Sequence, residues 1–321
     1  MNLHSTGYTR IKWGRGFSYF NCNGERIKDK EKIDYFKSLA IPPSWKSVWI
    51  NESKSGKLLA HGRDKKNRKQ YIYSDSYLEE REAKKYSKLN LFGKVLPEIR
   101  ARNQRLLKKP TASKKYALGV ALEILDNIYI RVGHLHYLNE NGTHGLTTLK
   151  NRHLNFSKGE VSLEYKAKTG QKRFIQLTDQ KISDHLKKAF EVESTYLFSY
   201  RDSDGQSCRL SAADINKYLS QFDFGNHRFT AKDFRTWGAN VLALEFFLRK
   251  KRKDNPEDVV KAVGQKMGHT SRVCQDAYIH PAINELLEKK IKLPSIEGTQ
   301  QNNLAQEERL LISLLNSYES S

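Results

Sequence analysis

TAKDFRTWGANVLALEFFLR, residues 230–249, is the stretch that decides how the second half of the chain folds. It opens with Thr230 and Asp233 at the spacing of a capping box, and apolar side chains then recur every three or four residues. The apolar positions are Phe234, Trp237, Val241, Leu244 and Leu248. This pattern predicts a long helix with one buried face.

A second helix is predicted directly downstream. Asn255 is suited to be its N-cap and Pro256 its first residue, and two acids follow in the first turn. The helix is expected to stop at Gly268, because glycine readily adopts the left-handed conformation that ends helices. The sequence after this stop, HTSRVCQDAYIHP at 269–281, predicts a further helix that carries Tyr278.

Outward from these helices, the second half continues to read as mainly helical. The remaining predicted elements are helices at residues 78–91, 96–107, 114–131, 179–191 and 211–221, and strands at 153–156, 160–166 and 173–177. Turns at 157–159 and 168–170 join the strands into a β interruption. A polar stretch at 295–303 precedes a short amphipathic segment at 304–318.

The first 75 or so residues read as mainly β. Aromatic and β-branched composition or period-two alternation predicts strands at residues 11–20, 45–50 and 69–74, with a helix at about 30–39. The whole chain is therefore expected to have an α+β fold. Its expected parts are a small, mainly antiparallel β domain at 1–85, a larger α-helical domain with a three-stranded β or hairpin insertion at 86–294, and a polar tail with a short amphipathic helix at 295–321.

The charge balance is strongly positive. The chain has 321 residues, with 57 Lys and Arg against 36 Asp and Glu, which gives a formal net charge of +21 and a pI of about 9.7. Nucleic-acid phosphate is the commonest target of such an excess, because each neutralised phosphate releases counterions. We therefore expect a nucleic-acid partner.

Several protein classes are disfavoured by the sequence. No apolar run approaches the roughly 18 residues of a membrane span, and the N-terminal residues lack the apolar stretch of a signal peptide. Cys22, Cys208 and Cys274 lie far apart, which disfavours a disulfide framework and a structural zinc site. We expect a protein that is not secreted: cytoplasmic or in the nucleoid if bacterial, in the virion or host cytoplasm if viral.

Common cofactor motifs are missing from the sequence. It has no GxxxxGK[ST] loop for a nucleoside triphosphate, no GxGxxG dinucleotide turn and no HExxH zinc helix. His134 and His136 stand two residues apart, and such a pair is more often ordinary surface than a metal site. We expect no ATP and no essential metal, although a divalent cation could stimulate the protein.

Three residues in the quoted stretches could carry chemistry. Arg235 lies within the predicted long helix and is expected at the rim of its buried face. His269 follows a helix end, and Tyr278 comes nine residues later. Taken singly, each has an ordinary interpretation, since most arginines are exposed or ion-paired and most such tyrosines pack with a solvated hydroxyl.

Taken together, these stretches resemble the catalytic domain of the type IB DNA topoisomerases, in particular the short poxvirus-like and bacterial branch. KDFRTWGAN matches the K-x-L-R-T-x-G motif with Phe234 in place of Leu, and Ala167 in YKAKTG stands where many relatives have Gly. IPPSWKSVWI and HGRDKKNRKQYIY resemble the family's small DNA-clamping domain. By this resemblance the catalytic residues are Arg131, Lys168, Arg235, His269 and Tyr278.

The resemblance also implies contacts with DNA. The implied DNA-binding residues are Arg68, Gln70, Tyr71, Tyr73, Tyr137 and Lys232. Gln70 is suited to such a role, because a glutamine can bond the major-groove edge of adenine bidentately. The alternative for Tyr71 and Tyr73 is that one face of this strand packs a core.

The implied residue types fit one reaction, the relaxation of supercoiled duplex DNA through a 3′-phosphotyrosyl intermediate. Attack of a tyrosine on a phosphodiester adds negative charge to the non-bridging oxygens, which two arginines and a histidine can stabilise without a metal. The 5′-oxygen leaves poorly unless it is protonated, and a lysine of lowered pKa is a suitable acid. The covalent link conserves the energy of the broken bond, so religation needs no ATP.

Two other functions remain open from the residues. A tyrosine recombinase uses the same residue set but usually has His three residues before the second arginine, where this sequence has Lys232. A non-enzymatic DNA-binding protein with a decayed site is the third hypothesis. We expect a monomer that closes around duplex DNA as a C-shaped clamp.

Overall fold

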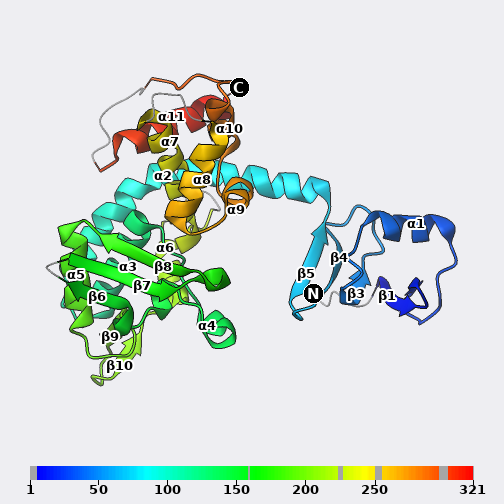
Figure 1. Cartoon of the computed structure of the whole chain (residues 1–321), viewed down its shortest axis with the longest axis horizontal. Coiled ribbons are helices and arrows are strands. Elements are labelled where there is room, and N and C mark those ends of the chain that lie inside the picture. Colours follow the sequence, from blue (N-terminus) through cyan, green and yellow to red (C-terminus); the bar gives the residue numbers. More distant parts are fainter. Residues whose placement is uncertain (1–5, 158–159, 223–226, 250–254, 296–302, 321) are drawn as a thin grey trace. The chain divides into compact units, whose positions relative to one another are not determined.

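A computed structural model describes residues 6–157, 160–222, 227–249, 255–295 and 303–320 (Figure 1). The chain divides into two compact units, Met1–Lys85 and Tyr86–Ser321. Part of the turn expected at 157–159 and nearly all of the polar stretch expected at 295–303 lie outside the described residues. Antiparallel sheets and helices together confirm the predicted α+β class.

The first unit is built on a five-stranded antiparallel sheet with the strand order β2-β1-β3-β4-β5. Its elements are β1 (Tyr8–Trp13), β2 (Gly16–Phe20), α1 (Lys30–Ser38), β3 (Lys46–Ile50), β4 (Leu58–Arg63) and β5 (Lys69–Tyr73). Phe36 of α1 is 2% exposed and packs against Tyr8 and Tyr19, with ring centroids 4.8 Å apart in both pairs. The helix thus covers one face of the sheet, as its apolar spacing predicts.

One prediction for this unit was wrong, and one strand was missed. The expected single strand at 11–20 is a hairpin, because the chain reverses at Gly14, where φ is +55°. Strand β4 was not predicted at all. Its sequence, LLAHGR, contains no β-branched residue and includes a glycine, so the usual signal of a strand is weak.

The second unit is mainly helical. Its helices are α2 (Asp75–Leu106, which begins in the first unit), α3 (Lys114–Ile128), α4 (Leu135–Asn141), α5 (Gln180–Phe190), α6 (Ala212–Leu219), α7 (Ala231–Arg249), α8 (Pro256–Met267), α9 (Ser271–Ala277), α10 (Pro281–Leu287) and α11 (Gln306–Glu319). Its strands are β6 (Leu154–Ser157), β7 (Glu160–Lys166), β8 (Lys172–Leu177), β9 (Ser199–Arg201) and β10 (Ser207–Arg209). The first three form the antiparallel insertion that the sequence predicts, and the β9–β10 hairpin was not predicted.

Helix α7 packs against several other helices of this unit, and glycines allow two of its contacts to be very close. Trp237 is 1% exposed, and a Cβ on Gly93 of α2 would lie 2.3 Å from its indole. On another side, a Cβ on Gly238 would lie 2.2 Å from the ring of Tyr129. Both glycines therefore permit approaches that any side chain would block.

The helix predicted at 114–131 ends three residues early, at Ile128. Tyr129 adopts a left-handed conformation with φ +55° and places its ring against Gly238. This contact with α7 stops the helix, which the local sequence does not reveal. As a result Arg131 lies on an extended segment after α3 and not on the helix itself.

The predicted amphipathic C-terminal segment forms α11 and packs on its own chain. Leu310, Leu311, Leu314 and Leu315 are buried, and α11 contacts α7. Its Glu308 is 4% exposed and accepts hydrogen bonds from Arg100 (2.8 Å) and from the Trp237 indole (3.1 Å). In the described ranges no helix is both long enough and apolar enough to span a membrane.

Candidate active site

The carbonyl groups at the C-terminal end of α8 are the centre of the candidate site. Arg173 donates to the carbonyl oxygens of Gln265 (3.0 Å) and Lys266 (2.8 Å). Arg235 and Arg131 donate to the next two carbonyls, each at 3.3 Å. The last carbonyls of a helix have no partners within the helix and carry the negative end of its dipole. This helix end therefore gathers three guanidinium groups, and among the described residues none of the three is paired with a carboxylate.

Arg235 is deeply buried, which corrects its expected place at the rim of α7. It is 3% exposed and donates to the Tyr129 carbonyl as well as to Met267. Its Nε atom is buried and has no hydrogen-bond partner among the described residues. A fixed guanidinium with an unused donor suits the recognition of an oxyanion.

Tyr278 and His269 lie face to face beside Arg235. Their ring planes differ by 4° and their centroids are 4.8 Å apart, while the Arg235 guanidinium carbon lies 5.4 Å from the centroid of the Tyr278 ring. Tyr278 follows α9 as its C-cap residue and is 8% exposed, so it stands at the helix end and not within the helix as predicted. Neither buried ring nitrogen of His269 makes a well-formed hydrogen bond to any residue in the described ranges.

Asn240 holds the backbone around Tyr278. Its Nδ2 donates to the Tyr278 carbonyl (2.9 Å), and its Oδ1 accepts from the His280 amide (2.8 Å). Asn240 is 0% exposed, and sequence reasoning missed it. The available signal was an amide inside the apolar run of α7, since a buried amide needs partners.

Burial and the charges of the arginines together determine the pKa values in this site. Burial alone would raise the pKa of the Tyr278 phenol, but the charges of Arg235 and Arg131 outweigh burial and hold this pKa below its ordinary value. Burial, assisted by the same two charges, lowers the pKa of His269 to about 4. Burial and the Arg235 charge also lower the pKa of Arg131. His269 is therefore neutral near pH 7.

Lys168 comes from a different element, the short turn Lys168–Gly170 between β7 and β8. It lines a polar pocket together with Arg131, Arg173 and Arg235, and its side chain is exposed. Ala167 adopts an extended conformation with φ −87°, so the glycine that many relatives have there is not required by this turn. The structure thus brings the five predicted catalytic residues into one unit, with Lys168 approaching from the hairpin.

Two of the predicted DNA-contact residues are held by one carboxylate in the first unit. Asp64 accepts hydrogen bonds from Arg68 Nε (2.8 Å) and from Gln70 Nε2 (3.0 Å). The Arg68 hydrogen bond is the main reason that the pKa of Asp64 falls to about 2. These two side chains are therefore arranged in advance beside β5.

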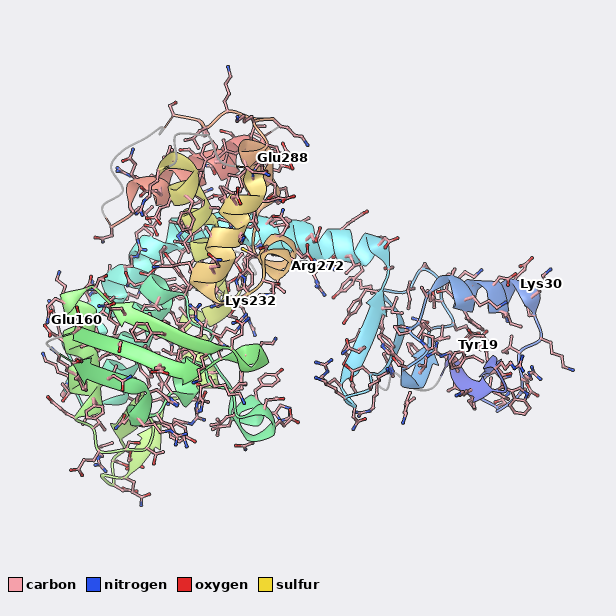
Figure 2. All side chains as sticks on the ribbon, viewed as in Figure 1. Tyr19, Lys30, Glu160, Lys232, Arg272 and Glu288 are labelled. Carbon is pink, nitrogen blue, oxygen red and sulfur yellow. The ribbon has the colours of Figure 1, made fainter. Side chains whose placement is uncertain are left out.

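The aromatic residues of β5 do not pack the core. Ile72 contacts the core, whereas Tyr71 is 47% exposed and stacks on Tyr73 at 6.0 Å with planes 21° apart. In the second unit Tyr137 of α4 is 55% exposed, and Lys232 is exposed near the start of α7 (Figure 2). These four side chains are accessible to a ligand to different extents.

The paired histidines lie at the start of α4. His134 is the N-cap residue of α4, and His136 lies 3.2 Å from Glu140 of the same helix. Among the described residues no group of three or more His, Cys, Asp or Glu side chains could hold a metal ion.

Comparison with known proteins identifies relatives of both units. The family model described as "Eukaryotic DNA topoisomerase I, catalytic core" matches residues 66–305, and "Bacterial DNA topoisomerase IB, N-terminal domain" matches residues 16–64. DNA topoisomerase 1B of Acanthamoeba polyphaga mimivirus is 30% identical over 288 residues, which cover 85% of each chain. DNA topoisomerase 1B of Vaccinia virus (strain Copenhagen) is 25% identical over 301 residues, 90% of this chain and 92% of the relative.

Among solved structures, XerH site-specific recombinase bound to a palindromic difH substrate has 18% sequence identity and a TM-score of 0.38, covering 71% of this chain and 58% of that chain. The catalytic-core match spans more than half of the sequence, and the mimivirus relative aligns over most of both proteins. The resemblance predicted from the dispersed motifs is thereby confirmed. This chain belongs to the type IB DNA topoisomerases.

Proposed function

We propose that this topoisomerase relaxes supercoiled duplex DNA with Tyr278 as its nucleophile. The Tyr278 oxygen attacks a backbone phosphorus, a new P–O bond forms to the tyrosine, and the bond from phosphorus to the 5′-oxygen breaks. The strand is then held through a 3′-phosphotyrosyl link while the other end rotates. Attack of the freed 5′-hydroxyl on this link reverses the step and reseals the strand.

The observation that carries this proposal is that Tyr278 lies beside both a histidine and a buried arginine. The rings of Tyr278 and His269 stack at 4.8 Å, and Arg235 holds the pKa of the phenol below its ordinary value. A phenol in this field passes its proton to water more readily during attack. In our proposal Arg131 and Arg235 stabilise the extra charge on the non-bridging oxygens, and His269 donates one further hydrogen bond.

Lys168 is proposed to protonate the leaving 5′-oxygen. It lines the same pocket as the two arginines and reaches it from the β7–β8 turn, so it is placed near a phosphate that the arginines would hold. No other cofactor is needed in this scheme, because arginines supply the positive charge and the phosphotyrosine conserves the bond energy. We therefore propose relaxation without ATP and without an essential metal.

The first test is incubation of the pure protein with supercoiled plasmid, EDTA and no ATP. Relaxation is expected for the wild type. Tyr278→Phe should bind DNA but yield neither relaxation nor a covalent adduct. Strand exchange between specific sites would instead support a recombinase, and a mobility shift without relaxation would support a passive DNA-binding protein.

The second test separates the roles of Lys168 and Arg235. A substrate with sulfur at the scissile 5′-bridging position has a leaving group that needs no proton. Cleavage by Lys168→Ala should be slow on the normal substrate and restored on the sulfur substrate. Arg235→Ala should stay slow on both, because its task concerns the non-bridging oxygens. The opposite pattern would overturn these assignments.

DNA binding is proposed to involve both units. We propose contacts from Arg68, Gln70, Tyr71 and Tyr73 in the first unit and from Tyr137 and Lys232 in the second. We also propose a monomer that encloses the duplex as a C-shaped clamp, acting in the cytoplasm or nucleoid of a bacterium or in the virion or host cytoplasm of a virus. Light scattering at moderate salt should give the mass of one chain, and a stable dimer would contradict the proposal.

A further inference from the structure

Arg173 is the third arginine at the end of α8, and the proposed reaction does not use it. It lies on β8, directly opposite Tyr165 of β7, and its guanidinium group crosses to the helix. There it donates to two successive carbonyl oxygens, at 3.0 and 2.8 Å. A Cβ on Gly268 would lie 2.8 Å from the Arg173 Cζ atom, so the guanidinium group sits against the backbone just before His269.

We propose that Arg173 is a positioning residue for Lys168. The inference rests on the proposed role of Lys168 as the acid for the 5′-oxygen. Arg173 stands five residues after Lys168, on the strand that leaves the turn, and ties that strand to the helix end on which Arg131 and Arg235 are also held. It thus fixes the lysine-bearing hairpin relative to the groups that hold the phosphate.

The need for such a tie follows from the hairpin itself. Lys168 is exposed, and its turn projects from the end of a two-strand ladder whose last paired residues are Lys166 and Lys172. The strand that enters the turn has its own tie, because the His144 amide donates to the Lys166 carbonyl at 2.8 Å. Arg173 supplies the corresponding tie for the strand that leaves the turn.

Arginine is well suited to this task. Two N–H groups of one planar guanidinium reach two neighbouring carbonyls, whereas a lysine presents one point charge on a flexible stem. The positive charge also lies at the negative end of the α8 dipole, which strengthens the contact. Arg173→Lys should therefore keep the charge but lose part of the fixed geometry.

The test compares single-turnover cleavage of two duplexes that differ only at the scissile 5′-bridging atom, oxygen or sulfur. On the oxygen substrate we expect Arg173→Ala to be slower than wild type by about 10²-fold, the effect of misplacing a catalytic group by about 1 Å. On the sulfur substrate, which needs no acid, its rate should return close to the wild-type rate. Arg173→Lys should fall between wild type and Arg173→Ala on the oxygen substrate.

Arg201 of β9 offers a matched control. It is also an arginine on a hairpin that donates to two backbone carbonyls, those of Gly205 (3.2 Å) and Glu193 (3.3 Å). Arg201→Ala should cleave both substrates at the wild-type rate. Thermal unfolding of each variant reports whether the fold is retained, and if Arg173→Ala unfolds, the comparison of the two substrates is made with Arg173→Lys.

The outcomes separate this inference from the proposed function. If Lys168→Ala is rescued by sulfur and Arg173→Ala is not, Arg173 acts through other groups and the inference is wrong. An Arg173→Ala variant with the wild-type rate on the oxygen substrate overturns it as well. If Lys168→Ala itself is not rescued, the assignment of Lys168 as the acid fails, and the inference about Arg173 fails with it.

Discussion

Residues of helix α7 contact two clusters of buried charge, and the clusters differ in how that charge is compensated. Trp237 contacts a paired-charge cluster of Arg100, Asp126 and Glu308, and Arg235, two residues earlier, belongs to the site at the end of α8. The first cluster is closed by carboxylates. The second holds its cations against neutral carbonyls, and in the described part of the chain neither Arg131 nor Arg235 is paired with a carboxylate.

In the paired-charge cluster every strong donor has an acceptor. Arg100 binds Asp126 through two nitrogens (2.7 and 3.0 Å) and Glu308 through two contacts of 2.8 Å. Glu308 also accepts from the Trp237 indole and from the Ala305 amide. Burial would raise the pKa of Glu308, but Arg100 outweighs burial and lowers it. Such a cluster specifies how α2, α3, α7 and α11 pack.

At the end of α8, several buried hydrogen-bonding atoms make no well-formed hydrogen bond to any of the described residues. The Nε atom of Arg235 and both ring nitrogens of His269 are buried without well-formed hydrogen bonds among the described residues. Unmet polar groups are costly to bury, and carbonyl dipoles compensate a cation less fully than a carboxylate does. In the first cluster carboxylates neutralise the buried charge, whereas in the second the charge is left available for the anionic ligand that we propose.

The largest effect is expected from removing one carboxylate charge from the paired-charge cluster. Glu308→Gln leaves the Arg100 and Asp126 pair without its second carboxylate, and removal of one partner from a buried ionic group costs about 3–5 kcal/mol. We expect the free energy of unfolding to fall by this amount in denaturant titration. Glu307→Gln, on the same helix, is the control and should change it little. A Glu308→Gln protein as stable as wild type would show that the cluster is not structural.

The second prediction concerns the removal of one charged side chain from the cluster at the end of α8. Arg235→Ala removes a buried cation that has no carboxylate partner among the described residues, but it also leaves the carbonyls of Tyr129 and Met267 without this donor. The free energy of unfolding should therefore fall by less than in Glu308→Gln. Cleavage should nevertheless slow by about 10²–10³-fold, the usual cost of losing one charge-stabilising donor. The two measurements are chemical denaturation and single-turnover formation of the covalent adduct. A loss of stability as large as that of Glu308→Gln would contradict the comparison.

The third prediction concerns the binding of a simple anion to the cluster at the end of α8. Sulfate should bind where the phosphate is proposed to bind and stabilise the protein by RT ln(1 + [L]/Kd), about 2.7 kcal/mol at one hundred times Kd. Thermal unfolding is measured in sulfate and in chloride of equal ionic strength. Arg235→Ala should lose most of the sulfate-specific gain, whereas Glu307→Gln should keep it. Equal gains in both variants would indicate only a general salt effect.

The sequence predicted the elements of the site better than their geometry. The periodic apolar residues of α7 and the Gly268 stop of α8 gave correct helices, because both are local signals. The burial of Arg235 was missed, since it depends on Tyr129 and Met267, which lie far away in the sequence. Long-range backbone acceptors of this kind leave no trace in local periodicity.

The early end of α3 and the role of Asn240 were missed for the same reason. Tyr129 leaves the helix because its ring packs on Gly238, and Asn240 is satisfied by the backbone on either side of Ile279. In both cases a residue of α7 determines the conformation of a remote segment. The sequence therefore located the residues that we propose to be catalytic, while contacts of α7 decide how the backbone around Tyr129 and Tyr278 is held.

The smallest effect concerns the protonation of His269 in the cluster at the end of α8. In the folded protein the pKa of His269 is about 4, below its ordinary value of 6.5, because burial and two arginines oppose a further positive charge. The unfolded chain therefore binds more protons between about pH 6.5 and pH 4. Stability from this group is fully present above pH 6.5 and is lost as the pH falls through that window.

We expect His269 to account for up to about 2 kcal/mol of lost stability between pH 7 and pH 5. His269→Asn should lose correspondingly less on acidification in denaturant titrations at the two pH values. Tyr278→Phe retains the imidazole and its two arginine neighbours, so it should keep the wild-type dependence on pH. Sulfate should also weaken this dependence in the wild type, because an anion held by the arginines favours the protonated imidazole. If His269→Asn loses as much stability between pH 7 and pH 5 as the wild type does, His269 is not responsible for this pH dependence.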